Sequence, residues 1–276
     1  SHCTIGETEH PFTINFSRDD VRITTHYHAD MVASSLFSVI HEGGHALYEL
    51  HTGRELARSN LGTGVSMGIH ESQSRFYENI IGRSRAFCSV IYPWLKEHFA
   101  PRLDHVTEDD FYRMINKSEP SLIRTEADEL TYCLHIMVRY ELEKRMFDGS
   151  LTAHDLPAEW NRLYKEYLGI DVPDDRQGVL QDSHWANGNI GYFPSYAIGS
   201  AYGAQYLQEM SKDLDVDAVV RSGDLTPINN WLEDRIWKHG CMKDPVALFE
   251  SVCGKFDPAC YVAYLEKKFP EVYGLS

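Results

Sequence analysis

Residues 31–54 read MVASSLFSVIHEGGHALYELHTGR and contain the pattern H-E-x-x-H, with His41, Glu42 and His45 at its fixed positions. Apolar residues recur around this pattern at intervals of three and four, which is the period of one buried helical face. Side chains four apart share a helix face, about 5–6 Å apart at Cβ, so two imidazoles in this spacing suit one metal ion. Glu42 lies about 100° further round the helix, within reach of a water on that ion without being a ligand. The stretch therefore predicts a helix that carries a metal site.

Two adjacent glycines, Gly43 and Gly44, lie between the histidines. Each should destabilise a helix interior by up to about 1 kcal/mol relative to alanine. A departure from local rules at one spot is typical of a functional site. We therefore expect something to approach the helix backbone closely at this point.

The third metal ligand is expected from Glu71, which follows a glycine-rich loop over residues 59–68. A carboxylate there completes a site of two histidines and one glutamate, and leaves a fourth position for water. The alternative is that Glu71 complements the helix dipole at the start of a helix. Its neighbours His70 and Gln73 are candidates for substrate binding or for support of the ligands, unless they are simply solvated.

Length and composition describe an ordinary globular chain, which we treat as a single catalytic region over residues 1–276. Hydrophobic residues make up 43% of the 276 and charged residues 24%; these are values typical of globular proteins. No apolar run approaches the eighteen or so residues that span a membrane. Because the chain opens on Ser-His-Cys, without a methionine or a signal peptide, we expect a fragment or a processed chain.

Charge and cysteine usage narrow the partners and the compartment. The formal net charge is −15, which argues against nucleic acid or an anionic membrane as a partner. An anionic substrate would therefore need a local arginine. The six cysteines form no C-x-x-C pair, so free thiols in a reducing cytosol are the better interpretation.

The fold class is expected to be mainly α, with a small β-hairpin beside the active-site helix. Residues 13–16 and 21–27 read as two strands joined by a turn. Long helical patterns follow over residues 69–91, broken near Pro93, and over residues 121–147. Residues 178–203 are rich in glycine and aromatic residues, and predict an ordered loop that leads into a helix. From residue 211 to about 273 the pattern is helical.

Three further residues are candidates for contact with a substrate. Arg124 is either half of a surface ion pair with Asp128 four residues on, or a cation in the cleft that holds a substrate carboxylate. His184 is a candidate for polarising a carbonyl or stabilising an oxyanion, with Asp182 orienting it. Tyr196 offers a hydroxyl for the same purpose, although core packing is the commoner role of a tyrosine.

Six stretches resemble the motifs of the carboxypeptidase Taq family of zinc metallocarboxypeptidases, in the same order. They are HPF at 10–12, DVRIT at 20–24 (family pattern DxRxT), HEGGH at 41–45 (HExxH), HESQ at 70–73 (HES/GQ), IRTEAD at 123–128 (IRxxAD) and GVLQDSHW at 178–185 (GxxQDxHW). None departs from its pattern. Full-length members of the family are about twice this length and carry a helical N-terminal half that is absent here, so the resemblance implies a C-terminal catalytic portion.

The resemblance implies a role for each candidate residue. His41, His45 and Glu71 would bind zinc (with cobalt as a substitute), and Glu42 would be the general base. Arg124 and His184 would face the substrate, and Tyr196 would donate a hydrogen bond in the transition state. Family members remove C-terminal residues one at a time from peptides with a free carboxylate and with broad preference. They are cytoplasmic and usually form homodimers.

Two alternatives stay open at this point. The same zinc chemistry suits an endopeptidase or a dipeptidyl peptidase. A chain of half the family's length also suits a non-catalytic zinc-binding half-enzyme that needs its missing half.

Overall fold

The computed structural model describes residues 2–275 and divides into two compact units. The first unit comprises the chain up to residue 115 together with residues from 199 onward, and the second comprises residues 116–198. The expectation of a single catalytic region over residues 1–276 concerns function, and it stays a prediction.

A small mixed sheet opens the first unit. Its strands are β1 (Cys3–Glu7), β2 (Thr13–Ser17) and β3 (Asp20–Thr25), in the order β1-β3-β2. The central strand β3 runs parallel to β1 and antiparallel to β2. The predicted hairpin of β2 and β3 is confirmed, whereas β1 was missed. Four of the five β1 residues are exposed, so this edge strand lacks the alternation of apolar and polar residues that identifies a half-buried strand.

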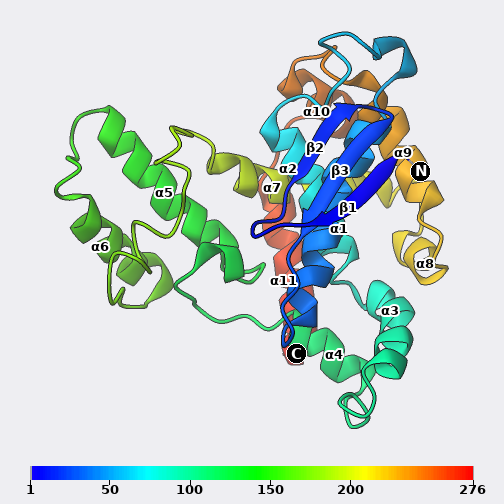
Figure 1. The fold of residues 1–276 in the computed structure, drawn as a ribbon, viewed down its shortest axis with the longest axis horizontal. Helices are drawn as coiled ribbons and strands as arrows, with labels where there is room; N and C mark the ends of the chain where they lie inside the picture. The colour runs from blue at the N-terminus through cyan, green and yellow to red at the C-terminus, as the bar shows by residue number, and fades with distance from the viewer. Residues whose placement is uncertain (1, 276) are drawn as a thin grey trace. The chain divides into compact units, whose positions relative to one another are not determined.

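The sheet packs on helix α1 (Val32–Leu50), which is the predicted metal-site helix. Figure 1 shows the three strands lying alongside α1. Val21 and Ile23, two apart on one face of β3, form a buried cluster with Ala46 of α1. The same sheet face carries Thr13 and Asn15 of β2, whose side chains reach carboxylates of α1. Two polar contacts and one apolar cluster therefore fix the position of α1 against the sheet.

The helical pattern after residue 66 is interrupted at a different place from the one predicted. Helix α2 (Met67–Arg75) runs directly into the π-helix η2 (Phe76–Ile81), and α3 (Arg85–His98) follows. Pro93 lies inside α3, so the predicted break near it is wrong. The break comes at residues 82–84 because Ser84 starts a new helix, its hydroxyl accepting a hydrogen bond from the backbone N–H of Phe87.

Most of the other helices of the first unit contribute to an aromatic core. They are η1 (Arg54–Leu56), α4 (Glu108–Ile115), α7 (Pro194–Met210, which begins in the second unit), α8 (Val216–Arg221), α9 (Thr226–Arg235), η4 (Trp237–His239), α10 (Pro245–Cys253) and α11 (Ala259–Tyr273). The core cluster includes Tyr48, Phe76, Tyr206, Trp237 and Phe249. Helices were correctly predicted beyond residue 211, and so was the loop that leads into α7.

The second unit is built on α5 (Tyr132–Phe147) and α6 (Leu156–Leu168), which pack through Leu142 and Trp160 among others. The predicted helix over residues 121–147 is wrong in its first half, where the chain forms only one short 3₁₀ turn, η3 (Arg124–Glu126). The Asp128 side chain accepts hydrogen bonds from the two backbone N–H groups at residues 130 and 131. These local bonds compete with helical ones.

The fold class is confirmed: helices dominate, and the described residues contain one three-stranded sheet. Among residues 2–275, no helix combines the length and the apolar character needed to cross a bilayer. No disulfide joins any of the six cysteines, all of which lie within the described residues.

The two glycines of α1 differ in surroundings, which gives a matched pair of substitutions. A Cβ at Gly44 would lie 2.7 Å from both the carbonyl oxygen of Gln73 and the Cα of Ser74, while at Gly43 no atom of the described residues, beyond the adjacent backbone of α1, lies within 4 Å. We expect Gly44→Ala to lower the free energy of unfolding by about 1–3 kcal/mol through overpacking. Gly43→Ala should leave it unchanged or raise it by up to about 1 kcal/mol through helix propensity. Urea unfolding with a chelator present measures both, and equal effects would contradict this packing.

Candidate metal centre

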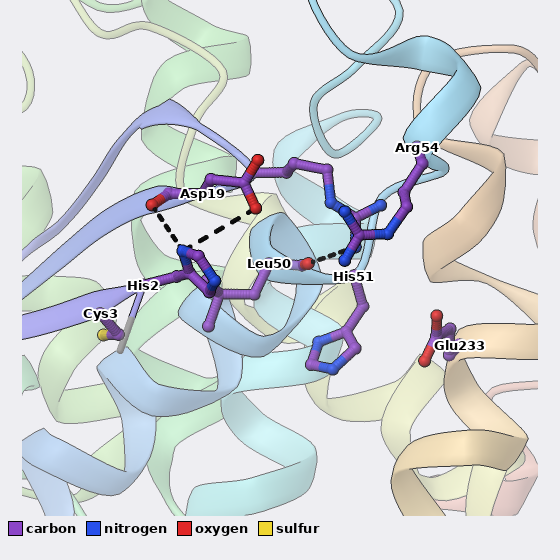
Figure 2. A pocket seen from close by; sticks show the side chains of 8 residues that line it. His2, Cys3, Asp19, Leu50, His51, Arg54 and Glu233 are labelled. Atoms are coloured by element: carbon purple, nitrogen blue, oxygen red, sulfur yellow. Dashed lines mark hydrogen bonds and ion pairs between the residues drawn. The ribbon is translucent and has the colours of Figure 1, made fainter.

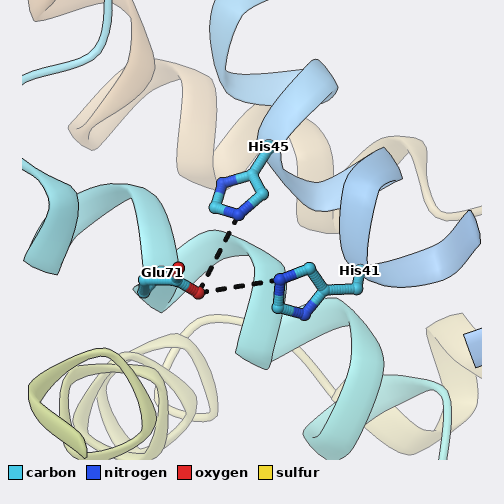
Figure 3. A group of neighbouring side chains, drawn as sticks. All are labelled: His41, His45 and Glu71. Atoms are coloured by element: carbon cyan, nitrogen blue, oxygen red, sulfur yellow. Dashed lines mark ion pairs between the residues drawn. The ribbon is translucent and has the colours of Figure 1, made fainter. Parts of the chain in front are cut away.

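Three side chains of the first unit converge on one point. His41 and His45 come from α1, and Glu71 comes from the middle of α2 (Figure 3). The Glu71 Oε2 atom lies 3.7 Å from Nε2 of His41 and 3.8 Å from Nε2 of His45. Of the residues described, only these three form a group able to hold a metal ion, with ligand atoms within 4.8 Å of one another. The predicted alternative role of Glu71 as a helix-start charge is therefore unnecessary.

The donor set and its spacing fit a divalent cation. Ligands bound at about 2.0–2.2 Å in a tetrahedron lie about 3.3–3.6 Å from one another. The observed separations of 3.7 and 3.8 Å are slightly wider. The Glu71 carboxylate is held by the hydroxyl of Ser74, 2.9 Å from Oε2. The two separations are within about 0.5 Å of those in a tetrahedral zinc site, so these residues fit a divalent ion.

Close packing of three helices brings the ligands together. The backbone of α2 passes so near Gly44 that a Cβ there would collide with it, as predicted from the glycine pair. On the other side of α2, a Cβ at Gly199 of α7 would lie 2.6 Å from the Cβ of Glu71. Small residues on two neighbours therefore hold the Glu71 helix between α1 and α7.

His41 is backed by a buried carboxylate. Its Nδ1 lies 2.8 Å from Oε2 of Glu78, which also pairs with Arg75 at 3.3 Å and with Arg83 at 3.5 Å. Burial acts to lower the pKa of His41, but the hydrogen bond and charge of Glu78 outweigh it and raise the pKa. The pKa of Glu78 is lowered: burial opposes its charge, and Arg75, His41 and Arg83 more than compensate.

His45 has different surroundings. Its Nδ1 lies 3.0 Å from Nδ1 of His70, and Nε2 of His70 lies 2.7 Å from Oε1 of Glu49. Burial, together with the charges of His41 and His70, holds the pKa of His45 well below its usual value. A neutral imidazole is the form that binds a metal.

Glu42, the predicted general base, lies on α1 next to the ligand His41. Its carboxylate accepts a hydrogen bond of 2.6 Å from the Thr13 hydroxyl, which lies 3.0 Å from the Glu42 carbonyl oxygen as well. Burial raises the pKa of Glu42, against the opposing effects of the His41 charge and the Thr13 hydrogen bond. A carboxylate with a raised pKa is suited to accept and release a proton near neutral pH.

Gln73, a predicted substrate contact, is enclosed by other side chains. Its amide donates to the Ser72 hydroxyl at 2.8 Å and accepts from the indole N–H of Trp237 at 2.8 Å. The side chain is fully buried. These contacts connect α2 to η4, and a role for Gln73 in substrate binding stays a prediction.

The predicted carboxylate-binding arginine lies in the second unit. Arg124 is 5% exposed and binds Asp182 through Nε at 2.9 Å and Nη2 at 2.8 Å. Asp182 also pairs with Arg139, and the pKa of Asp182 is lowered because the two guanidinium charges outweigh its burial. The alternative of a surface ion pair between Arg124 and Asp128 is wrong, because η3 turns the Arg124 side chain into this buried network.

His184 and Tyr196 are neighbours in the same unit. The Tyr196 hydroxyl lies 3.2 Å from Nε2 of His184, and the His184 ring packs 4.4 Å from that of Phe193. Asp182 was expected to orient His184, but its carboxylate is bound by the two arginines instead. Contacts of His184 and Tyr196 with a substrate stay predictions.

A separate cavity of about 450 Å³ lies at the C-terminal end of α1. His2, Asp19, His51, Arg54 and Glu233 are among its lining residues (Figure 2). Arg18 also lines the cavity. Its guanidinium donates a hydrogen bond of 3.1 Å to the carbonyl oxygen of Leu50, at the end of α1. Charges of both signs line the cavity, and none of the metal-site ligands belongs to it.

Sequence reasoning missed the residues that surround the ligands. Glu49 lies four residues after His45 and so shares its helix face, and Glu78 lies seven residues after Glu71. These spacings are visible in the sequence, but acidic residues on a helix are usually solvated. The contacts of Thr13 and Asn15 with α1 join residues 29 and 34 apart, and no local pattern encodes them.

Comparison with known proteins agrees with this geometry. The sequence profile of the carboxypeptidase Taq (M32) metallopeptidase family matches residues 1–269. Carboxypeptidase 1 of Bacillus subtilis is 45% identical over 271 residues, which are 98% of this chain and 54% of that protein. Thermostable carboxypeptidase 1 of Thermus thermophilus is 44% identical over 272 residues, 98% of this chain and 53% of that protein.

A solved structure shows the same fold. The M32 carboxypeptidase from Deinococcus radiodurans superposes with a TM-score of 0.96 at 39% identity, over 99% of this chain and 56% of that one. The chain thus spans about half the length of the relatives it matches, as the motifs implied. Its sequence profile, its fold and its His-His-Glu cluster agree, and the chain belongs to the carboxypeptidase Taq (M32) family of metallopeptidases.

Proposed function

We propose that this chain is the catalytic portion of a zinc-dependent metallocarboxypeptidase, which removes single residues from the C-terminus of peptides with broad preference. The observation that supports the proposal is the convergence of His41, His45 and Glu71, with Glu42 adjacent to His41 in α1. Three protein ligands with one open position are typical of catalytic zinc sites, whereas structural zinc sites use four. Cobalt is the proposed substitute for zinc.

The chemistry divides between the ion and the protein. A bound divalent ion lowers the pKa of a water toward 7 and polarises a carbonyl. Glu42 accepts the proton of the attacking water and passes it to the leaving amine. Thr13 holds the Glu42 carboxylate in place through a hydrogen bond of 2.6 Å. This division assigns one proton-transfer role to one buried carboxylate.

Substrate recognition is assigned to residues of the second unit. Arg124 is the proposed contact for the terminal carboxylate, with His184 and Tyr196 as donors to the oxyanion. Arg124 also binds Asp182 and Tyr132, so a substrate carboxylate would join these two side-chain partners. The resemblance to the family supports a cytoplasmic homodimer acting on peptides.

Matched peptides test the specificity. We expect a blocked peptide with a free C-terminal carboxylate to be shortened by one residue at a time, and the same peptide with a C-terminal amide to be cleaved far more slowly. Loss of a charged hydrogen-bonding partner in a buried site leaves the other group unpaired, so a site built for it discriminates by about 10⁴–10⁵-fold. Mass spectrometry of the products identifies the bond. Equal cleavage of both peptides, or release of dipeptides, would instead assign endopeptidase or dipeptidyl peptidase activity.

The length of the chain favours one second candidate, a metal-binding half-enzyme without activity of its own. The chain covers about half of its relatives, 54% of the protein from Bacillus subtilis. In that case the chain binds zinc with the same affinity but turns over peptide only in the context of the full-length protein. Assaying the two side by side, at equal zinc occupancy, separates the candidates.

A further inference from the structure

A continuous line of buried hydrogen bonds runs from the metal ligand His45 to the β-sheet. Nδ1 of His45 meets Nδ1 of His70 at 3.0 Å, and Nε2 of His70 meets Oε1 of Glu49 at 2.7 Å. Glu49 is 3% exposed. The Glu49 carboxylate on this line therefore has almost no access to water.

Three donors besides His70 hold that carboxylate. Its Oε1 accepts hydrogen bonds from the backbone N–H of Gly64 and the hydroxyl of Thr63, both at 2.9 Å. Its Oε2 accepts one of 2.7 Å from the side-chain amide of Asn15 on β2. The pKa of Glu49 is lowered: burial acts to raise it, but the bonds from His70, Gly64 and Thr63 outweigh burial. Glu49 is thus fixed in position and orientation from three separate segments.

The chemistry of this line sets the tautomer of each imidazole. A carboxylate only accepts hydrogen bonds, so the neighbouring Nε2 of His70 carries the hydrogen. In neutral His70 the other nitrogen, Nδ1, is then an acceptor, and the hydrogen between the two rings belongs to Nδ1 of His45. The lone pair of His45 is left on Nε2, which is the atom that faces Glu71.

The partner ligand reaches the same result by a shorter route. Nδ1 of His41 lies directly against Glu78, 2.8 Å away. Hydrogen bonds that orient a ligating histidine are a general device of metal sites, and their loss typically weakens metal binding by about 10–100-fold. What distinguishes His45 is that a second histidine separates it from its carboxylate.

We propose that Glu49, acting through His70, is a positioning residue for the metal ligand His45, and that Asn15, Thr63 and Gly64 hold Glu49 for this purpose. The proposal rests on the metal cluster of the proposed function. It assigns His70 to the support of a ligand, in place of contact with a substrate. It also gives β2 and the loop before α2 a role in metal affinity.

The first test needs neither metal nor substitution. Two-bond ¹⁵N–¹H spectra of the chelator-treated protein report which ring nitrogen of each histidine carries the hydrogen. We expect the Nδ1–H tautomer for His45 and the Nε2–H tautomer for His70. An Nε2–H tautomer at His45 would overturn the proposal.

The second test measures the zinc dissociation constant by competition with a chromophoric chelator. We expect Glu49→Ala and His70→Phe each to raise it by about 10–100-fold. Because Glu49 acts through His70, the double variant should bind zinc as tightly as His70→Phe alone. If the two substitutions acted independently, their losses of zinc-binding free energy would add. Gln205→Leu is the matched control, since Gln205 is buried and its hydrogen bonds go to residues 253, 255 and 257; its zinc affinity should equal that of the wild type.

The outcomes separate the two proposals. A wild type that binds no zinc refutes the metal site itself. A wild type that binds zinc, with unchanged affinity in Glu49→Ala and His70→Phe or with additive losses in the double variant, refutes only the positioning role.

Discussion

Replacing Glu42 with glutamine should leave zinc binding intact and lower kcat by about 10²–10⁴-fold, the usual contribution of a general acid–base group. Glutamine keeps the size of the side chain and the hydrogen bond from Thr13, but it cannot accept a proton. Glu42 is not one of the three ligands, so the ion should remain in place. Steady-state kinetics at matched zinc content measures the effect, and a KM close to that of the wild type is expected.

A control separates this role from a general effect of charge. Glu97 of α3 is exposed, and Glu97→Gln removes the same charge from the surface. Its kcat should equal that of the wild type. Wild-type turnover in Glu42→Gln, with the metal content matched, would remove Glu42 from the mechanism.

Replacing Glu71 with alanine should weaken zinc binding by at least about 100-fold. Structural zinc sites bind the ion with an apparent free energy of about 10–16 kcal/mol, which corresponds to several kcal/mol per ligand. The loss should also abolish the stabilisation that zinc gives to the folded state, about 2.7 kcal/mol at a free concentration 100 times the dissociation constant. Chelator competition and thermal unfolding with and without zinc measure the two effects, with Glu97→Ala as the control.

A normal affinity in Glu71→Ala would mean that another residue supplies the third ligand. Glu78 is another carboxylate bound to His41, with its Oε2 2.8 Å from the ring. However, that carboxylate contacts Nδ1 of His41, on the side of the ring away from the Nε2 atom that faces Glu71. An ion at Nε2 of His41 would have Glu71 as its ligand, whereas an ion at Nδ1 would have Glu78. Glu71→Ala weakens zinc binding only in the first arrangement.

The site was predictable from sequence to the extent that it is local. His41, Glu42 and His45 lie within five residues on one helix, and helical geometry alone places them together. Glu71 was expected from its place after the glycine-rich loop, and the family resemblance implied the same residue, but the loop between the two helices gives no distance. The glycine pair correctly indicated a close approach, but only Gly44 is contacted, and nothing in the structure accounts for Gly43.

The features that were not predicted depend on contacts between distant residues. Edge strand β1 exists because it pairs with β3 eighteen positions on, although its own residues are mostly exposed. Helix α5 begins only at Tyr132 because Asp128 binds the backbone ahead of it. The line from His45 to Asn15 joins two helices and one strand, and its hydrogen bonds link residues 21 to 34 positions apart, which no pattern of periodicity encodes.

The location of a bound ion tests the central claim most directly. Anomalous diffraction at the zinc edge, on crystals of the zinc-loaded protein, gives the position of the ion and its ligand atoms. The account predicts one ion at about 2.0–2.2 Å from Nε2 of His41, Nε2 of His45 and a carboxylate oxygen of Glu71. An ion bound elsewhere, or coordinated without Glu71, would contradict it.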